Sequence, residues 1–198
     1  MEGNSAVRRQ HAGAGGILPS MSTVSDSAPF SRVKIRVGAL VFCGEDVALI
    51  RRDRLSGSHY TPPGGNVEPG EDILDALARE LAEELHLHLA DATTPELCWL
   101  QDQMVSRPGP TAPPRKLHLI FRCLITPEVR ATLAAVEYDE QPDGTTEPGI
   151  IEWVSYRKLG ELPLFPLVGP AAAVLPSPGA PVASTYLPPV TDQNYTWI

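Results

Sequence analysis

Residues 65–87 read GNVEPGEDILDALARELAEELHL, and this stretch decides how the rest of the chain is interpreted. From residue 72 to about residue 85 it consists of strong helix formers, and its apolar residues recur at helical spacing. These are Leu74, Leu77, Ala78, Leu81 and Leu85. The negative charge of Asp72 suits the first turn of a helix, where the backbone dipole is positive. The stretch therefore predicts one amphipathic helix whose apolar side packs on a core.

Three glutamates crowd another side of this predicted helix. Glu80, Glu83 and Glu84 are spaced i, i+3 and i+4, so their carboxylates share a face beside the leucine stripe. Such like charges destabilise a bare helix, and a solvated acidic face would be the simplest explanation for them. However, the preceding residues 62–65 are PPGG, and glycines let a backbone approach a ligand closely. We interpret the face as a site for hard divalent cations, which prefer oxygen ligands.

The same stretch resembles the Nudix box. That motif reads G, five residues, E, seven residues, R-E, an aliphatic residue, any residue, E-E, any residue, G and an aliphatic residue. The positions in register are Gly65, Glu71, Arg79, Glu80, Leu81, Glu83, Glu84 and Leu87. His86 stands where the family has glycine, at the predicted helix end, where glycine would suit a left-handed cap. Histidine tolerates that conformation better than most residues, so the departure concerns the cap rather than the carboxylates.

The resemblance implies a fold and a set of metal ligands. The fold would be α+β, a Nudix-type α/β/α sandwich with a mixed sheet. Glu80, Glu83 and Glu84 would bind Mg²⁺, for which Mn²⁺ could substitute, and the Gly64 carbonyl would add a further ligand. Mg²⁺ suits such a site because it binds few carboxylates, keeps several waters and is completed by substrate phosphates. Glu80 or Glu83 would also serve as the general base.

Other residues would support these ligands. The resemblance gives Arg79 and Glu71 the role of orienting the carboxylates. Family members often add an acidic residue from a later loop. Glu147 is the first candidate here, because it lies five residues before Glu152 in a loop that contains glycine and proline, and Glu140 is the second.

The implied function is Mg-dependent hydrolysis of a pyrophosphate bond in a nucleoside triphosphate, or in a nucleoside diphosphate linked to another group. An alternative is a non-catalytic Nudix-like module that senses a nucleotide metabolite, but such modules are expected to lose the carboxylates that this chain keeps. Isomerase chemistry on an isoprenoid diphosphate would require a suitably placed cysteine, and neither Cys43 nor Cys98 has a recognisable setting for it. No signature outside the box identifies the substrate.

Five side chains outside the box are candidates for substrate binding: Arg36, Arg51, Arg52, Tyr60 and His118. An arginine could reach a phosphate, and Tyr60 could stack on a base. Packing under the glycine loop would explain Tyr60 equally well. The solvent face of a sheet would explain Arg36 and His118.

The flanking sequence predicts strands around the helix. Apolar runs and alternation favour strands over residues 33–42, 47–50, 97–105, 116–125 and 150–154. Residues 53–70 are expected to form a loop, and residues 156–162 a short helix. Residues 126–149 are polar and show no clear pattern. In residues 116–125, Leu117 and Leu119 share one face, while Lys116 and His118 share the other.

The composition bounds the domain. We expect residues 1–31 to be a disordered tail with Met21 as an alternative start, residues 32–168 to form the Nudix domain, and residues 169–198 to be an irregular tail. The chain contains 21 prolines, and beyond Pro163 they recur too often for long helices or central strands.

Charge and cysteine content narrow the partners. The formal net charge of -8 disfavours sequence-independent binding to nucleic acid, so we expect a small nucleotide-type substrate. No apolar run reaches the roughly 18 residues of a membrane span. Three widely spaced cysteines predict reduced, buried thiols, and we expect a cytoplasmic protein. Nothing in the sequence decides for or against a homodimer.

Overall fold

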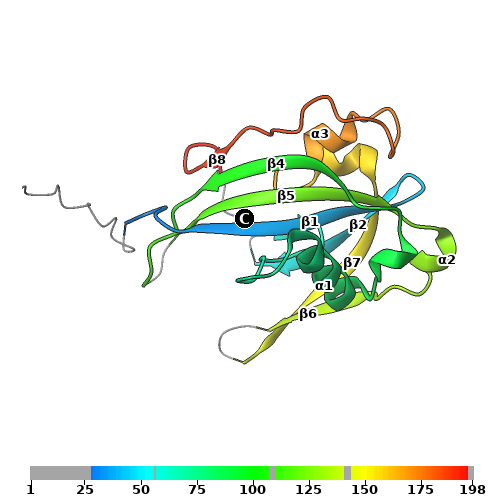
Figure 1. Ribbon diagram of the computed structural model, residues 1–198, viewed down its shortest axis with the longest axis horizontal. Helices are drawn as coiled ribbons and strands as arrows, with labels where there is room; N and C mark the ends of the chain where they lie inside the picture. Colours follow the sequence, from blue (N-terminus) through cyan, green and yellow to red (C-terminus); the bar gives the residue numbers. More distant parts are fainter. Residues whose placement is uncertain (1–27, 56, 108–109, 141–143, 196–198) are drawn as a thin grey trace, which may run out of the picture.

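The computed structural model describes residues 28–55, 57–107, 110–140 and 144–195, and its centre is one mixed sheet (Figure 1). The strands follow the order β6-β7-β2-β1-β5-β4-β8, and β3 pairs with β2. Their bounds are β1 Val33–Cys43, β2 Asp46–Arg54, β3 Gly57–Thr61, β4 Glu96–Met104, β5 Arg115–Leu124, β6 Val136–Glu140, β7 Thr146–Ser155 and β8 Val190–Thr191. The β1–β5 and β4–β8 pairs are parallel and the other pairs are antiparallel. Residues 1–27 of the predicted N-terminal tail lie outside the described residues.

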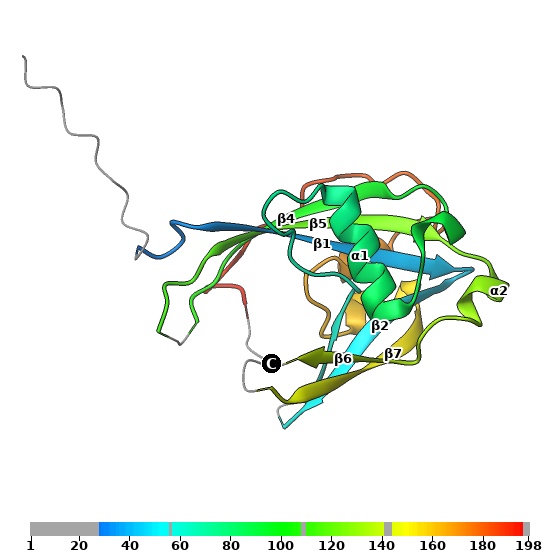
Figure 2. The same cartoon turned by 60° about the horizontal axis from the view of Figure 1, so that its bottom comes forward.

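Two layers cover the sheet. Helix α1 (Ile73–Leu85) packs on one face against β1, as Figure 2 shows. The short helices η2 (Tyr156–Glu161) and α3 (Gly169–Ala173) cover the other face with the C-terminal segment (Figure 1). The short connecting helices are η1 (Leu89–Asp91) and α2 (Pro127–Arg130). The predicted α/β/α sandwich with a mixed sheet is confirmed. None of the described helices is both long and apolar enough to cross a bilayer.

Several segments differ from the expectation. The predicted loop 53–70 contains β3, which returns antiparallel along β2, and the unpatterned stretch 126–149 contains α2, β6 and the start of β7. Leu74, expected on the apolar stripe of α1, is 46% exposed because the first turn of the helix projects beyond the sheet. All three cysteines are buried and free, as predicted.

The segment beyond residue 168 is integrated into the second layer. Leu175, Leu187 and Val190 are almost fully buried, and β8 pairs with the edge strand β4. Its prolines prevent long regular elements, as expected, but apolar residues between them still reach the core. The packed structure therefore continues past the boundary inferred from composition.

The course of β1 creates the opening for a site. This strand pairs with β5 along nearly its whole length, but with β2 only over residues 41–43. Where β2 departs, the loop that follows β3 takes its place. The Val37 N–H donates to the Gly65 carbonyl at 3.0 Å, and the Ala39 N–H donates to the Pro63 carbonyl at 2.9 Å. The backbone groups of β1 are thus satisfied by a loop instead of a strand.

Gly64 lies at the closest point between this loop and β1. Its φ is +143°, a conformation that side chains disfavour. A Cβ atom at this position would lie 2.2 Å from the Val37 carbonyl oxygen, which belongs to backbone and cannot turn away. Glycine is required here by both conformation and space.

We expect Gly64→Ala to lower the free energy of unfolding by about 3 kcal/mol, since it combines overpacking with backbone strain. Gly70→Ala is the matched control: Gly70 also has a positive φ, of +83°, but a Cβ there would meet nothing within 4 Å. That variant should lose about 1 kcal/mol. Urea unfolding monitored by circular dichroism measures both, and equal losses would contradict the close approach to β1.

Candidate functional site

Helix α1 is held by caps at both ends. The Asp72 side chain accepts a hydrogen bond from the Leu74 N–H at 2.8 Å and so acts as the N-cap. Leu77, Leu81 and Leu85 are fully buried, which fixes the rotation of the helix. His86 ends the helix in the left-handed conformation, with a φ of 58°. The cap geometry expected for the family glycine is therefore kept by histidine.

This rotation turns two of the three glutamates toward a cavity. Glu80 and Glu84 line it, with side chains that are largely shielded from solvent. Glu83 points outward, and 61% of its side chain is exposed. The i, i+3, i+4 spacing thus gives one shared face, with Glu83 at its open edge.

Arg79 ties the acidic side chains together. It makes a bidentate contact with Glu71, through Nε at 2.8 Å and Nη2 at 3.1 Å. Its Nη1 donates to Glu80 Oε1 at 2.8 Å and to Glu83 Oε2 at 3.3 Å. Its Nη2 also reaches the Asn66 carbonyl at 3.1 Å. The planar guanidinium therefore orients the carboxylates, which is the arrangement that the resemblance implied for Arg79 and Glu71.

The glycine loop closes over the helix from the other side. The Gly64 N–H donates to Glu84 Oε2 at 2.6 Å. A Cβ atom on Gly65 would lie 2.1 Å from Glu80 Oε1, so the loop backbone and this carboxylate leave no space between them. The carbonyls of Pro63 and Gly65 are used by β1, and the Gly64 carbonyl, the predicted ligand, lies between them.

Burial makes these carboxylates reluctant to ionise. Desolvation raises the pKa of Glu84 to about 8, although the Gly64 N–H works in the opposite direction. Burial also raises the pKa of Glu80, against the effect of Arg79. By contrast, the hydrogen bonds from Arg79 lower the pKa of Glu71. The pair on the cavity wall thus carries a desolvation cost that a bound cation would offset.

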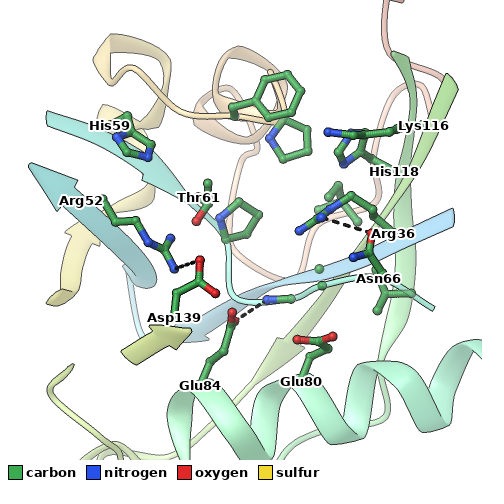
Figure 3. Close-up of a pocket in the computed structure, with 18 of the residues that line it drawn as sticks. Arg36, Arg52, His59, Thr61, Asn66, Glu80, Glu84, Lys116, His118 and Asp139 are labelled. Carbon is green, nitrogen blue, oxygen red and sulfur yellow. Dashed lines mark hydrogen bonds and ion pairs between the residues drawn. The ribbon is translucent and has the colours of Figure 1, made fainter. Parts of the chain in front are cut away.

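The cavity has a volume of about 490 Å³ and a basic opposite wall. Figure 3 shows Glu80 and Glu84 on one side and Lys116 and His118 on the other. Arg36 lies between them, and its Nη1 donates to Asn66 Oδ1 at 3.2 Å. The strands β1 and β5 contribute residues from the face opposite α1, whereas β2 contributes Arg52 from the α1 face. The cavity therefore lies where β1 and β2 part.

His118 is a neutral wall residue. It is 4% exposed, and its Nε2 lies 2.9 Å from Gln103 Oε1. Burial lowers the pKa of His118 to about 3, so the ring carries no charge at neutral pH. Its neighbour Lys116, which sequence reasoning placed on this face without a role, keeps an amine at the cavity.

Two predicted substrate-binding residues lie elsewhere. Arg51 and Tyr60 are register partners on β2 and β3, so they share the face opposite Arg52. The Arg51 Nη1 donates to Glu152 Oε2 at 2.8 Å, and the Tyr60 hydroxyl donates to the same oxygen at 3.3 Å. Tyr60 is buried in the core under the C-terminal layer. Of the five candidates, the structure brings Arg36, Arg52 and His118 to the cavity.

The predicted extra acidic ligand is not at the cavity wall. The Glu147 carboxylate lies 3.7 Å from Arg54 Nε. Its cross-strand partner Asp139 does line the cavity, and Glu137, two residues earlier on β6, is buried in an ion pair with Arg52. Sequence reasoning missed both residues, although the alternation of residues 136–140 was the available signal. For Glu140 the structure describes the backbone, which ends β6.

The donor set was compared with the needs of a divalent cation. Across the described residues, no three His, Cys, Asp or Glu side chains are already gathered as a metal site. Arg79 occupies Glu80 and Glu83 in this conformation. The chemistry nevertheless fits: the carboxylates are hard oxygen donors, and the exposed Glu83 is free to rotate toward a cation beside Glu80 and Glu84.

Comparisons with known proteins agree with this site. The model of the NUDIX domain family matches residues 33–176. The human m7GpppN-mRNA hydrolase NUDT17 is 32% identical over 139 residues, which are 53% of this chain and 40% of that protein. The chain thus spans less than half the length of this relative.

Solved structures were also compared. A mutator MutT protein from Bacillus halodurans is 21% identical, with a TM-score of 0.48, and the match covers 70% of this chain and 79% of that one. The E. coli ORF135 protein is 22% identical, with a TM-score of 0.47 and coverage of 71% and 86%.

We expect Glu84→Gln to stabilise the metal-free protein at alkaline pH. Because the pKa of Glu84 is raised to about 8, the folded state holds its proton more tightly than the unfolded state. Stability should therefore fall as pH rises from the ordinary glutamate range to about 8. Glutamine keeps the acceptor for the Gly64 N–H but never ionises. Its Tm at pH 9 in EDTA should exceed that of wild type by about 5 °C, and the difference should vanish by about pH 5. A constant difference across this range would refute a buried, reluctantly ionised Glu84.

Proposed function

This chain belongs to the Nudix family, and from that premise we propose that it hydrolyses a pyrophosphate bond with the help of Mg²⁺. The substrate would be a nucleoside diphosphate linked to another group, or a nucleoside triphosphate. One observation carries the proposal: Glu80 and Glu84 face a cavity whose opposite wall is basic. A pyrophosphate between these walls would meet cations on one side and metal-binding carboxylates on the other.

Glu80, Glu83 and Glu84 would hold Mg²⁺, or Mn²⁺ in its place, and the Gly64 carbonyl would complete the set. When bound, the cation would screen the pyrophosphate charge, activate a water and stabilise the leaving phosphate. Glu147 remains a candidate for a further acidic ligand, and its partner Asp139 competes for the role because it lines the cavity.

The residues of the chain would divide the reaction among them. Water attacks one phosphorus, the bridging P–O bond breaks, and the water proton passes to a carboxylate. Glu80 suits this acceptance, because it lies on the cavity wall and burial raises its pKa. Arg79 and Glu71 would keep its carboxylate in place. Glu83 stays a second candidate for the base.

The basic wall would bind the substrate. Arg36, Arg52 and Lys116 supply positive charge toward the cavity, and neutral His118 supplies a polar ring. Arg51 and Tyr60 would act indirectly, by fixing β2 and β3 through Glu152. The human relative is named a hydrolase of m7GpppN-mRNA, whose cap joins two nucleosides through phosphates, so capped nucleotides belong in the substrate panel.

We expect turnover of at least one member of a nucleotide panel in the presence of Mg²⁺ and none in EDTA. The panel holds nucleoside triphosphates, nucleoside diphosphate sugars, dinucleoside polyphosphates and capped nucleotides. Glu83→Gln should lower kcat by about 100-fold or more, because it removes a carboxylate from the metal set. Release of phosphate and nucleotide, separated by chromatography, measures both.

Glu161→Gln is the matched control, since Glu161 is an exposed glutamate on η2. Its kcat should equal that of wild type. Identical turnover by wild type and Glu83→Gln would show that the proposed site is wrong. Ligand-induced shifts in Tm without turnover across the whole panel would instead favour a non-catalytic nucleotide sensor.

The charge of Lys116 predicts a pH effect on substrate binding. Burial, with help from Arg36 and Arg107, lowers the pKa of Lys116 to about 8. The amine is therefore charged below this pH, where it attracts phosphate, and the attraction is lost as pH rises above it. We expect KM to rise above about pH 8 in wild type but not in Lys116→Arg, whose guanidinium stays charged. Lys158→Arg, on an exposed lysine, should behave as wild type. A KM profile that Lys116→Arg leaves unchanged would remove Lys116 from the binding wall.

A further inference from the structure

A second cavity opens beside the catalytic one. Its volume is about 320 Å³, and four residues line both cavities: Arg54, His59, Thr61 and Phe165. Because the walls are shared, a ligand in the catalytic cavity can extend into the second without crossing solvent. The two spaces form one bent site with a polar and an apolar arm.

The apolar arm is built by a segment outside the Nudix box. Leu162, Leu164 and Leu167 line it, and Tyr195 closes it from the C-terminal segment. The backbone holds this segment beside β3: the Tyr60 N–H donates to the Pro163 carbonyl at 3.0 Å, and the Phe165 N–H donates to the Tyr60 carbonyl at 2.9 Å. The wall is therefore fixed to the strand that carries His59 and Thr61.

Phe165 is the partition between the arms. Its ring meets the His118 ring edge to face, with centroids 5.3 Å apart, on the catalytic side. It meets the Tyr195 ring on the other side, with centroids 5.4 Å apart and planes at 76°. Two rings at nearly a right angle offer one face for stacking and one edge for contact, which suits a flat guest. The Arg54 guanidinium at the same opening adds a planar cation that stacks on aromatic rings.

We propose that this second cavity, the aromatic slot (Arg54, His59, Leu164, Phe165, Leu167 and Tyr195), binds a nucleobase of the substrate. The inference rests on the proposed function, because it makes the slot an arm of the hydrolytic site. A flexible hydrocarbon chain would gain from the leucines but would leave the polar groups of His59 and Thr61 facing apolar surface. A base presents a flat apolar face together with a polar edge, and so matches both kinds of lining.

The slot assigns a direction to the substrate. With the pyrophosphate between the carboxylates and Lys116, the base lies past Phe165, toward β3 and Tyr195. The preferred substrate class is then a diphosphate that carries at least one nucleoside.

Two variants and one control test the slot. Tyr195→Ala removes a ring from the wall, and Leu167→Asn makes the wall polar at a side chain that is already 41% exposed, so folding is preserved. Tyr186→Ala is the matched control, a tyrosine that is 56% exposed and outside the slot. Circular dichroism and Tm first establish that all three are folded.

Hydrolysis is compared between ADP-ribose and a base-free analogue, two riboses joined through a 5′-5′ diphosphate. We expect wild type and Tyr186→Ala to favour ADP-ribose in kcat/KM by roughly tenfold, the worth of one stacked base. Tyr195→Ala and Leu167→Asn should bring the ratio close to one. Equal kcat/KM for both substrates in wild type, or a ratio that neither variant changes, would overturn the slot and leave the proposed hydrolysis standing.

Binding of free adenosine and 7-methylguanosine, followed by ligand-observed NMR in EDTA, tests the slot without any reaction. Binding that Tyr195→Ala abolishes and Tyr186→Ala keeps supports the slot even if no panel member is hydrolysed, in which case the proposed function alone has failed. Absence of nucleoside binding overturns the slot. So does binding of decyl phosphate that depends on Tyr195 while nucleosides do not bind, because the cavity would then take a chain.

Discussion

The contact of Gly64 with β1 is the constraint on which the site depends. The loop lies so close to the strand that a Cβ atom would fall 2.2 Å from the Val37 carbonyl oxygen. That closeness lets the neighbouring carbonyls accept hydrogen bonds from β1, and it directs the Gly64 N–H toward α1, where Glu84 accepts it at 2.6 Å. Sheet, loop and helix therefore meet at one residue. The position of the carboxylates follows from the fold and not from the helix alone.

The same closeness sets the electrostatics. Pressing Glu80 and Glu84 against the loop removes them from water, which raises the pKa of both. Arg79 compensates only in part, because its guanidinium also serves Glu71 and Glu83. A helix optimised for stability would not carry this arrangement, since buried carboxylates without a cation are costly. The unfavourable burial is understandable as the counterpart of cation binding, the usual exchange of stability for function at a site.

What the sequence could predict is what depends on neighbours along the chain. The rotation of α1, the left-handed His86 and the shared carboxylate face all follow from spacing within one helix. The split between Arg51 and Arg52 could not be predicted, because successive strand residues face opposite ways and the sequence does not say which face will carry the cavity. Asp139 and Phe165 were missed for a related reason. They reach the site only through strand pairing and chain return, which bring together residues far apart in sequence.

The C-terminal segment shows why the motif specifies chemistry more than substrate. Composition made this segment resemble a tail, since its prolines lack the N–H groups that regular elements need. Buried Gln101 on β4 supplies part of what is missing: its amide nitrogen donates to the Pro188 carbonyl at 3.1 Å, and its amide oxygen accepts from the Leu167 N–H at 2.8 Å. One side chain thus ties both parts of the segment to the sheet, and with them the wall that carries Phe165 and Tyr195. The carboxylates of the box can stay the same while this wall changes, so the identity of the substrate is determined by residues that carry no motif.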